Sequence, residues 1–258
     1  MADTPLKDRH AVVTGAGGDI GAAIVAELAR LGARVTLMAR TAATLEARRA
    51  ALPTARTAAV TLDVADPASV RTAFARARAE LGPPTILVNA AGIGEAAPFA
   101  KTDVALWRRT LDVDLTGAFL CAAEVVPGAL AEKWGRIVNV ASTAGLRGYK
   151  YMTAYCAAKH GLIGLTRALA LEVATTGVTV NAVCPTYADT EMTQRTIKNI
   201  VATTGRSPEQ ARGALERMNP LGRLITPAEV AQAVGWLCLP TSAAITGQSI
   251  GVAGGEVM

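Results

Sequence analysis

The sequence predicts an α/β fold, a doubly wound parallel sheet flanked by helices on both faces. Short β-branched runs alternate with Ala- and Leu-rich helical stretches, which is typical of a parallel sheet covered on both sides. Two runs, Ile86–Val88 and Ile137–Val140, are apolar throughout or nearly so, as expected of buried strands. Hydrophobic residues make up 51% of the 258 residues and charged residues 18%, so a large core can form.

We expect the strands in the short runs rich in Val, Ile, Leu and Thr. In chain order they are His10–Thr14, Arg34–Ala39, Ala58–Leu62, Ile86–Asn89, Arg136–Val140, Val178–Val183 and Ser249–Val252. The helices expected between them are Ile20–Leu31, Thr41–Ala51, Pro67–Leu81, a long helical region Asp103–Lys133, Thr153–Ala174 and Pro227–Cys238. Asp66, directly before Pro67, is the expected N-cap of its helix.

Residues 186–226 interrupt this alternation. The segment is polar, contains no expected strand, and carries two expected helices, Glu191–Ala202 and Pro208–Met218. Ligands of α/β sheets bind beyond the carboxyl ends of the strands, and this segment follows such an end. We therefore expect a substrate lid within a single domain of residues 1–258. The alternative is a surface insertion without a function.

Composition limits the partners and the compartment. The net charge is +5, but no run of five like charges appears and aromatic residues make up only 4%, so we expect no nucleic-acid partner. The four cysteines are far apart and form no CxxC pair, which indicates reduced thiols and no metal site. We expect no apolar stretch of transmembrane length and no signal peptide, and therefore a cytoplasmic protein without a membrane partner.

A glycine-rich loop follows the first strand and opens the first helix. Within Thr14–Gly21, glycines at 15, 17 and 21 allow a tight turn and the close approach of backbone to a pyrophosphate. The helix N-terminus behind them supplies N–H groups and the positive end of a dipole. The loop therefore predicts a dinucleotide site, with Gly15, Gly17, Asp19, Ile20 and Gly21 as binding residues.

The end of the second strand bears on the choice of nucleotide. Arg40 and Thr41 lie where the ribose of a dinucleotide is expected, and no carboxylate is present there to bind a 2′-OH. Because Arg40 can pair with a 2′-phosphate, we prefer NADP(H), with NAD(H) possible. A solvated arginine is the alternative. Asp63 can accept from the adenine amino group beside Val64, or it can cap a turn.

Tyr155 and Lys159 predict proton transfer, and Ser142 predicts the binding of a substrate oxygen. Tyr155 and Lys159 are four residues apart in an expected helix, so both side chains lie on one face. The alternative is an ordinary surface pair, which is the more common case for a tyrosine and a lysine at this spacing. A neighbouring ammonium lowers the pKa of a tyrosine, which helps Tyr155 to donate or accept a proton near neutral pH. Ser142 follows a strand end, where it can bind a substrate oxygen, although turn chemistry is the simpler explanation for a lone serine.

Together these features resemble the short-chain dehydrogenase/reductase family over nearly the full length. The resemblance rests on Thr14–Gly21, Asp63-Val64, Asn89-Ala90-Ala91-Gly92, Ser142, Tyr155-Cys156-Ala157-Ala158-Lys159 and Val180–Pro185. It implies a Rossmann fold, a Ser-Tyr-Lys site that interconverts a ketone and a secondary alcohol, and a homotetramer built on the long helices. It also implies that Lys159 and Tyr155 meet the nicotinamide ribose and that the cofactor pocket includes Asn89, Ala90, Gly92, Pro185 and Thr190.

Three positions depart from the family pattern. Asp19 stands where the phosphate loop has its central glycine, Asp114 stands where a supporting asparagine is usual, and Thr186 replaces the glycine after Pro185. Asp19 faces repulsion from a pyrophosphate, but we expect it to act as the N-cap of the first helix. An ionised Asp114 is expected to pair with Lys159 at the catalytic site and weaken its effect on Tyr155, whereas a protonated Asp114 can mimic the amide of the usual asparagine.

The substrate is the least determined part. In the similar 3-hydroxybutyrate dehydrogenases, the carboxylate-binding positions correspond to Gly94, Ala144, Met152 and Thr196, none of which is charged. The motif around Ser142 is similar to that of 3-oxoacyl and polyketide ketoreductases. We therefore expect a thioester-linked, apolar or cyclic ketone as the small-molecule substrate. The alternatives are an NAD-dependent secondary-alcohol or 3-hydroxyacyl dehydrogenase and a catalytically silent cofactor-binding protein.

Overall fold

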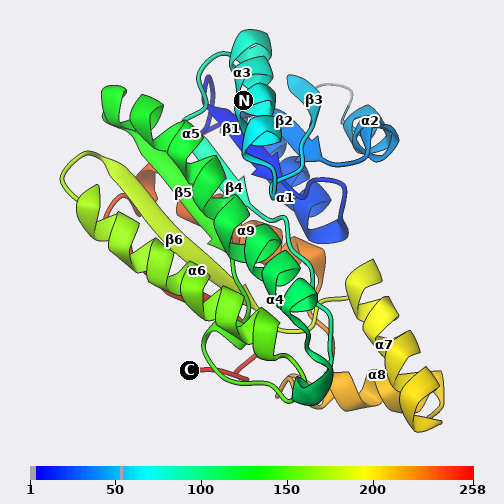
Figure 1. Ribbon diagram of the computed structural model, residues 1–258. Helices are drawn as coiled ribbons and strands as arrows, with labels where there is room; N and C mark the ends of the chain where they lie inside the picture. The colour runs from blue at the N-terminus through cyan, green and yellow to red at the C-terminus, as the bar shows by residue number, and fades with distance from the viewer. Residues whose placement is uncertain (1–3, 53–54) are drawn as a thin grey trace.

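The computed structural model describes residues 4–52 and 55–258, and these residues contain a parallel sheet of seven strands (Figure 1). The strand order is β3-β2-β1-β4-β5-β6-β7, so the order reverses between β1 and β4. The strands are β1 (His10–Thr14), β2 (Arg34–Ala39), β3 (Thr57–Thr61), β4 (Ile86–Asn89), β5 (Gly135–Val140), β6 (Val178–Pro185) and β7 (Ser249–Val252). The predicted doubly wound Rossmann fold is confirmed.

Helices connect successive strands, as the alternation predicted. They are α1 (Asp19–Arg30), α2 (Ala42–Ala50), α3 (Pro67–Leu81), α4 (Val104–Leu111), α5 (Gly117–Ala131), α6 (Thr153–Glu172), α7 (Glu191–Thr204), α8 (Pro208–Glu216) and α9 (Pro227–Cys238). Asp66 caps α3 by accepting a hydrogen bond from the Ala68 N–H, as expected. Three short 3₁₀ turns, Phe99–Lys101, Thr143–Gly145 and Pro240–Ser242, were not predicted.

Alternate strand residues supply two separate cores. On one face of the sheet, Ala11 and Val13 of β1 pack in a cluster with residues of α1 and α9. On the other face, Val12 packs in a cluster with residues of α3, α5 and α6. Successive side chains of a strand point to opposite faces, so apolar residues at consecutive positions fill both layers. This packing fixes the carboxyl ends of the strands at one edge.

The long helical region between β4 and β5 is continuous but irregular. A π-helical turn, Asp112–Thr116, lies between α4 and α5 and brings the side chain of Asp114 into the interior. By length and composition alone, Val104–Ala131 is apolar enough to cross a membrane, with a window of mean hydropathy 1.5 that is 39% buried. The expectation that no apolar stretch reaches this length was therefore wrong, because α4, the π turn and α5 form one helical run.

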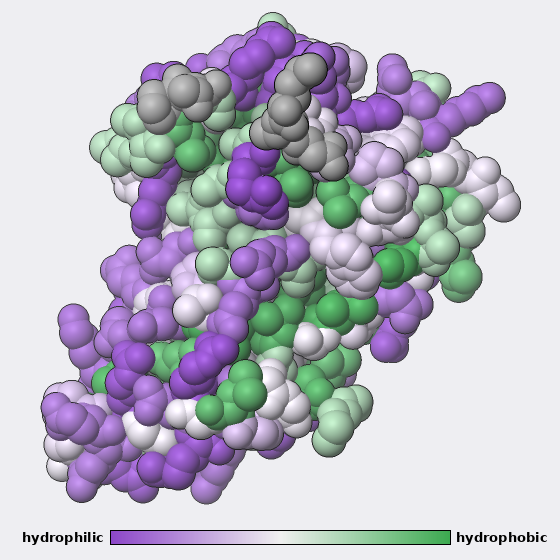
Figure 2. Space-filling model, turned by 180° about the vertical axis from the view of Figure 1, so that it is seen from behind, coloured by the Kyte–Doolittle hydropathy of each residue, from purple (hydrophilic) through white to green (hydrophobic). Residues whose placement is uncertain are grey.

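Residues 186–226 contain α7 and α8, close to the two helices predicted there. The two helices lie together at one corner of the molecule, apart from the helical layers that cover the sheet (Figure 1). Seen from behind, this corner is mostly hydrophilic (Figure 2). A parallel bridge between Ala188 and Ile225 joins the two ends of the segment.

Candidate active site

A cavity of about 430 Å³ lies at the carboxyl edge of the sheet, where β1 and β4 are neighbours. This is the point of strand-order reversal at which α/β sheets bind nucleotides. Of the residues expected to bind a cofactor, the lining includes Gly15, Gly17, Asp19, Ile20, Gly21, Arg40, Thr41, Asp63, Val64, Ala90, Gly92 and Thr190. Asn89, Pro185, Tyr155 and Lys159 are not part of that lining.

The phosphate loop has the properties of an anion site. Gly15 adopts a φ of +67°, and a Cβ on it would lie 2.5 Å from the Ala90 carbonyl oxygen. A Cβ on Gly21 would lie 2.2 Å from the Gly15 carbonyl oxygen, so both positions require glycine. The N-cap of α1 is Gly18, which provides no side-chain cap for the helix. The N–H groups at this helix start therefore fit the pyrophosphate of a dinucleotide.

The end of the cavity where the sequence places the adenosine is lined by residues that follow β2 and β3. Arg40 and Thr41 are exposed, and Thr44 of α2 joins them in the lining. Asp63 accepts a hydrogen bond at Oδ1 from the Ala65 N–H at 3.0 Å, which is the turn-capping alternative. Sequence reasoning missed Arg48 of α2, whose Nη2 lies 3.1 Å from Asp19 Oδ1 and 3.5 Å from the Gly17 carbonyl oxygen.

Helix α6 places Tyr155 and Lys159 on one face. The Lys159 Nζ lies 5.4 Å from the centroid of the Tyr155 ring and donates to the Val140 carbonyl oxygen at 3.2 Å. Ser142 is the N-cap of the short turn Thr143–Gly145, and its Oγ accepts from the Ala144 N–H at 3.1 Å. The Ser142 hydroxyl keeps a proton that it can donate, and its hydrogen bonding acts to lower the pKa of the neighbouring Tyr155.

Asp114 lies directly beside Lys159, as the sequence predicted. The Asp114 Oδ2 is 3.6 Å from the Lys159 Nζ, and both side chains are at least 96% buried. The Asp114 Oδ1 accepts from the Ile93 N–H at 2.7 Å. A Cβ on Gly92 would lie 3.4 Å from the Lys159 Nζ and 3.5 Å from Asp114 Oδ1, so the cavity wall touches this pair.

Comparison with known proteins identifies the family. The family model described as short chain dehydrogenase matches residues 9–200. The chain belongs to the short-chain dehydrogenase family. It is an oxidoreductase that acts on CH–OH groups with NAD(P).

Relatives of this short-chain dehydrogenase match it along nearly their whole length. A protein of Streptomyces violaceoruber, assigned as a ketoacyl reductase of the granaticin polyketide synthase, is 41% identical over 95% of this chain and 92% of its own. The 3-oxoacyl-(acyl-carrier-protein) reductase of Pseudomonas aeruginosa is 37% identical over 98% and 99%. A crystal structure of an actinorhodin polyketide ketoreductase variant with NADPH has a TM-score of 0.94 at 36% identity, covering 99% of each chain.

Burial and mutual attraction shift the pKa values of Asp114 and Lys159. Burial raises the pKa of the Asp114 carboxyl, although Lys159 and the Ile93 N–H oppose the rise. Burial acts to lower the pKa of Lys159, but Asp114 and Tyr155 together outweigh it and the pKa is raised. A buried charge that keeps a close opposite charge is stabilised in its charged form. Lys159 is therefore held as an ammonium.

The pKa of Tyr155 departs from the sequence prediction. Burial raises it, Lys159 opposes the rise, Asp114 adds to it, and Ser142 acts to lower it. The expected lowering was wrong for the net direction, because the desolvation of the hydroxyl exceeds the attraction of the ammonium. The effect of Lys159 itself has the predicted sign, and Asp114 weakens it as predicted.

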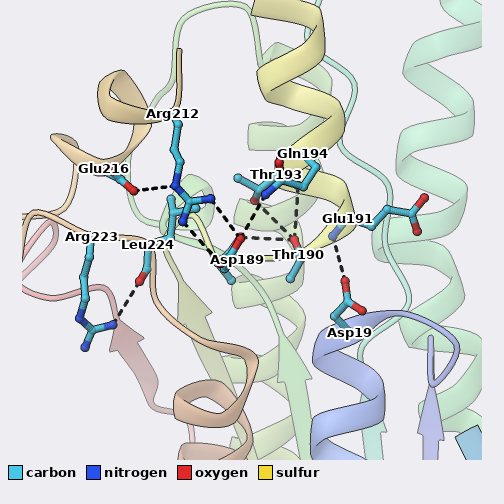
Figure 3. A network of polar contacts seen from close by, with 11 residues as sticks. Asp19, Asp189, Thr190, Glu191, Thr193, Gln194, Arg212, Glu216, Arg223 and Leu224 are labelled. Atoms are coloured by element: carbon cyan, nitrogen blue, oxygen red, sulfur yellow. Dashed lines mark hydrogen bonds and ion pairs between the residues drawn. The ribbon is translucent and has the colours of Figure 1, made fainter. Parts of the chain in front are cut away.

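Asp19 is not the N-cap of α1, which corrects the sequence expectation. Gly18 takes that position, and Asp19 is the first helical residue. Its Oδ2 accepts from the Glu191 N–H at 2.8 Å (Figure 3). Its Oδ1 pairs with Arg48, so the carboxylate does not cap its own helix. Thr190, the N-cap of α7, uses its hydroxyl to accept from the Thr193 N–H. The hydrogen bond between Asp19 and Glu191 therefore joins the phosphate loop to the start of α7.

Other predicted residues form the surroundings of the site. Asn89 is buried and donates from Nδ2 to Asn139 Oδ1 at 2.9 Å and to the Ala118 carbonyl oxygen at 3.3 Å. Pro185 is the buried last residue of β6. Sequence reasoning missed Met192 of α7, whose Sδ would lie 3.7 Å from a Cβ on Gly94, while Tyr155 Cε2 would lie 3.8 Å from it. Residues 186–226 therefore reach the neighbourhood of Tyr155.

The buried carboxylate of Glu256 is linked through Tyr149 to Thr143, the residue that follows Ser142. Glu256 binds the hydroxyls of Tyr149 and Thr186, and the Arg147 guanidinium lies 4.0 Å away. The Tyr149 hydroxyl also lies 2.7 Å from Thr143 Oγ1, the residue next to Ser142. Thr186, the departure after Pro185, therefore has a partner that a glycine would lack. Burial raises the pKa of Tyr149, and its bond to Glu256 raises it further.

Proposed function

We propose that this short-chain dehydrogenase is an NADP(H)-dependent ketone reductase that uses Ser142, Tyr155 and Lys159. The observation that carries the proposal is the placement of Tyr155 and a charged Lys159 on one face of α6, beside the wall of a cavity that starts at an uncapped helix N-terminus. The loop, the helix start and the cavity volume fit a dinucleotide.

In the proposed reaction, the bound nicotinamide nucleotide supplies hydride to the carbonyl carbon. Tyr155 donates its hydroxyl proton to the carbonyl oxygen during reduction and accepts it during oxidation. Ser142 orients that oxygen by donating its hydroxyl proton, while one of its two lone pairs accepts from the Ala144 N–H. Lys159 stabilises the Tyr155 phenolate that remains, and Asp114 keeps the ammonium in place.

The preference for NADP(H) rests on Arg40. The guanidinium is exposed in the cavity lining at the end of β2, with Thr41 and Thr44 beside it. Arginine pairs with a 2′-phosphate through several donors, whereas the 2′-OH of NAD(H) is usually bound by a carboxylate. The relative solved with NADPH supports the same choice.

For the substrate we propose a 3-oxoacyl thioester or an apolar or cyclic ketone. Gly94, Ala144, Met152 and Thr196 carry no charge that would bind a free carboxylate. Two relatives are named as reductases of ketoacyl or 3-oxoacyl groups, which supports a thioester. A 38% identical relative of Sinomonas cyclohexanicum, cis-4-hydroxycyclohexanecarboxylate dehydrogenase, supports a cyclic substrate as the second candidate.

We further propose that residues 1–258 form one domain, in which residues 186–226 are a lid over the substrate. We propose that the protein is cytoplasmic and has neither a membrane partner nor a nucleic-acid partner. For its assembly we propose a homotetramer. The exposed side chains of Trp107 and Phe119 on α4 and α5 support association through the long helices. Light scattering of the purified protein measures the assembly.

Fluorescence titration with NADPH and NADH, followed by a panel of ketones and 3-oxoacyl thioesters, tests the proposed function. We expect tighter binding of NADPH and turnover of at least one thioester or cyclic ketone. Tighter binding of NADH would refute the role of Arg40. NADPH binding without oxidation by any ketone would instead favour a silent cofactor-binding protein.

A further inference from the structure

Asp19 joins the phosphate loop to the start of the lid, residues 186–226. It is the first residue of α1, yet its Oδ2 accepts from the N–H of Glu191, the first residue of α7, at 2.8 Å (Figure 3). The sequence separation is 172 residues. Its Oδ1 lies 3.1 Å from the Arg48 Nη2. Both Asp19 and Glu191 line the cofactor cavity, so the contact spans its wall.

The lid is built as one body. Ile197 of α7 packs with Ala211 and Leu215 of α8 in a small hydrophobic core that is separate from the two cores of the sheet. Asp189, just before α7, binds the Arg212 guanidinium at 3.4 Å, and Arg212 also binds Glu216 at 2.8 Å (Figure 3). Helices α7 and α8 are therefore expected to move together rather than separately.

Residues at the ends of the segment are anchored, since Ala188 and Ile225 pack in the core of the sheet and Thr186 binds Glu256. Few polar contacts, however, join helices α7 and α8 to the rest of the described residues. At the base of the lid, the Asp189 N–H donates to the Ile225 carbonyl oxygen at 2.8 Å, which closes the two ends of the segment on each other. Among the hydrogen bonds and ion pairs of residues 4–52 and 55–258, the bond from Glu191 to Asp19 is the one that ties α7 to the phosphate loop. Breaking it would free the cavity side of the lid while leaving its base intact.

The charge of Asp19 is compensated in this position. Arg48 pairs with one carboxylate oxygen, and the other faces the N-terminal end of α7, whose dipole favours a negative charge. A carboxylate in a phosphate loop would otherwise repel a pyrophosphate. The observed contacts direct that charge to the lid instead.

We propose that Asp19 is a latch, a positioning residue that holds the lid closed over the cofactor cavity and slows the release of the bound nucleotide. This inference rests on the proposed binding of NADP(H). The latch and a simple repulsion between Asp19 and the pyrophosphate predict opposite changes in the rate of nucleotide dissociation. If Asp19 mainly repelled the pyrophosphate, its removal would slow nucleotide dissociation, whereas removal of a latch speeds dissociation.

A proline at position 191 removes the latch at its other partner. Glu191→Pro deletes the N–H that Asp19 accepts, and no hydrogen bond within α7 is lost because the first N–H of a helix has no partner inside it. Proline is favoured at this first helical position, and Thr190 has the extended backbone, φ −138° and ψ 164°, that a residue before proline adopts. Glu191→Ala is the matched control, because it loses the same exposed side chain and keeps the N–H.

Two measurements decide the proposal. Stopped-flow fluorescence gives the rate of NADPH dissociation, and hydrogen exchange of residues 188–218 without nucleotide reports the closure of the lid. For Glu191→Pro relative to Glu191→Ala we expect dissociation about 10-fold faster, since a hydrogen bond to a charged group is worth about 1.5 kcal/mol or more. We also expect faster exchange at the start of α7. Asp19→Gly should show both changes, and circular dichroism checks that each variant is folded.

Equal dissociation rates and equal exchange in the two position-191 variants would overturn the latch. Slower dissociation from Asp19→Gly would overturn it in favour of repulsion. If the wild-type protein bound neither NADPH nor NADH, the proposed function would fall and with it the effect on nucleotide release. Hydrogen exchange would then decide whether the contact closes the lid: faster exchange in Glu191→Pro supports closure, and equal exchange refutes it.

Discussion

Two regions of the molecule are held in place by different means: the proposed catalytic residues Ser142, Tyr155, Lys159 and Asp114 at the carboxyl edge of the sheet, here called the edge, and the proposed lid, residues 186–226. At the edge, Lys159 and Asp114 are buried, face each other at 3.6 Å and sit on elements that pack against the central sheet. At the lid, the ion pair of Asp189 and Arg212 leaves 49% and 39% of the side chains exposed, and one bond reaches the phosphate loop. The edge is suited to fixing atoms, and the lid is suited to opening and closing. Substitutions should therefore change chemistry at the edge and binding at the lid.

Tyr155→Phe should produce the largest effect, because it removes the proposed proton donor while keeping the ring. We expect a loss of turnover of about 10²- to 10⁴-fold, the range for a general acid. Nucleotide binding, measured by fluorescence titration, should remain within a few-fold. A variant that keeps most of its turnover would place proton transfer elsewhere.

Arg40→Ala tests the nucleotide preference without touching either region. Loss of a charged hydrogen-bonding partner of the 2′-phosphate should weaken NADPH binding by about 10- to 100-fold. NADH carries no 2′-phosphate, so its affinity should stay the same and serves as the internal control. Equal losses for both nucleotides would indicate a structural effect.

Asp114→Asn sharpens the account of the edge. The Asp114 carboxylate raises the pKa of Tyr155, so its removal should lower that pKa. Reduction requires the protonated tyrosine, and its alkaline limb should move to lower pH. Oxidation requires the phenolate, and its acid limb should also move to lower pH.

Activity of Asp114→Asn should persist, because the amide oxygen can still accept from the Ile93 N–H. Asp114→Ala is the contrasting variant. It leaves the buried Lys159 ammonium without its counter-charge and the Ile93 N–H without its acceptor, and should lower the free energy of unfolding by about 3 kcal/mol or more. Identical pH–rate profiles for wild type and Asp114→Asn would remove Asp114 from the acid–base account.

Arg212→Met should have the smallest effect. It breaks the pairs with Asp189 and Glu216 but retains the apolar stem of the side chain. Partly exposed ion pairs contribute less than about 1 kcal/mol, so thermal unfolding should hardly change. The KM for the substrate should rise a few-fold and kcat should change little. A large loss of kcat would show that the lid takes part in fixing the catalytic atoms.

The residues of the edge could be predicted from the sequence because their positions follow from local rules, namely the spacing of residues along a helix and the ends of apolar strands. The spacing of Tyr155 and Lys159 places both on one helical face. Apolar runs such as Ile137–Val140 predict buried strands. The positions of Ser142 and the glycine loop follow from strand ends. Even the pairing of Asp114 with Lys159 could be anticipated, since it depended on a matched motif.

What sequence reasoning missed depends on contacts between distant segments. Asp19 was expected to cap its own helix, the local choice for an aspartate at a helix start, but it binds Glu191 instead. Arg48 reaches it from α2, and Glu256 reaches Tyr149 across 107 residues. The net pKa of Tyr155 was missed because desolvation is a property of the packed site, which no spacing of residues reveals.

The π turn at Asp112–Thr116 makes the length of this helix matter more than its composition. Such a turn contains one residue more than an α-helical turn, and each residue of an α-helix advances the face by about 100°. Deleting a single residue there would rotate α4 relative to α5 and swing Asp114 away from Lys159. An insertion or deletion within this run would therefore change the surroundings of Lys159 even if it replaced no residue of the candidate site.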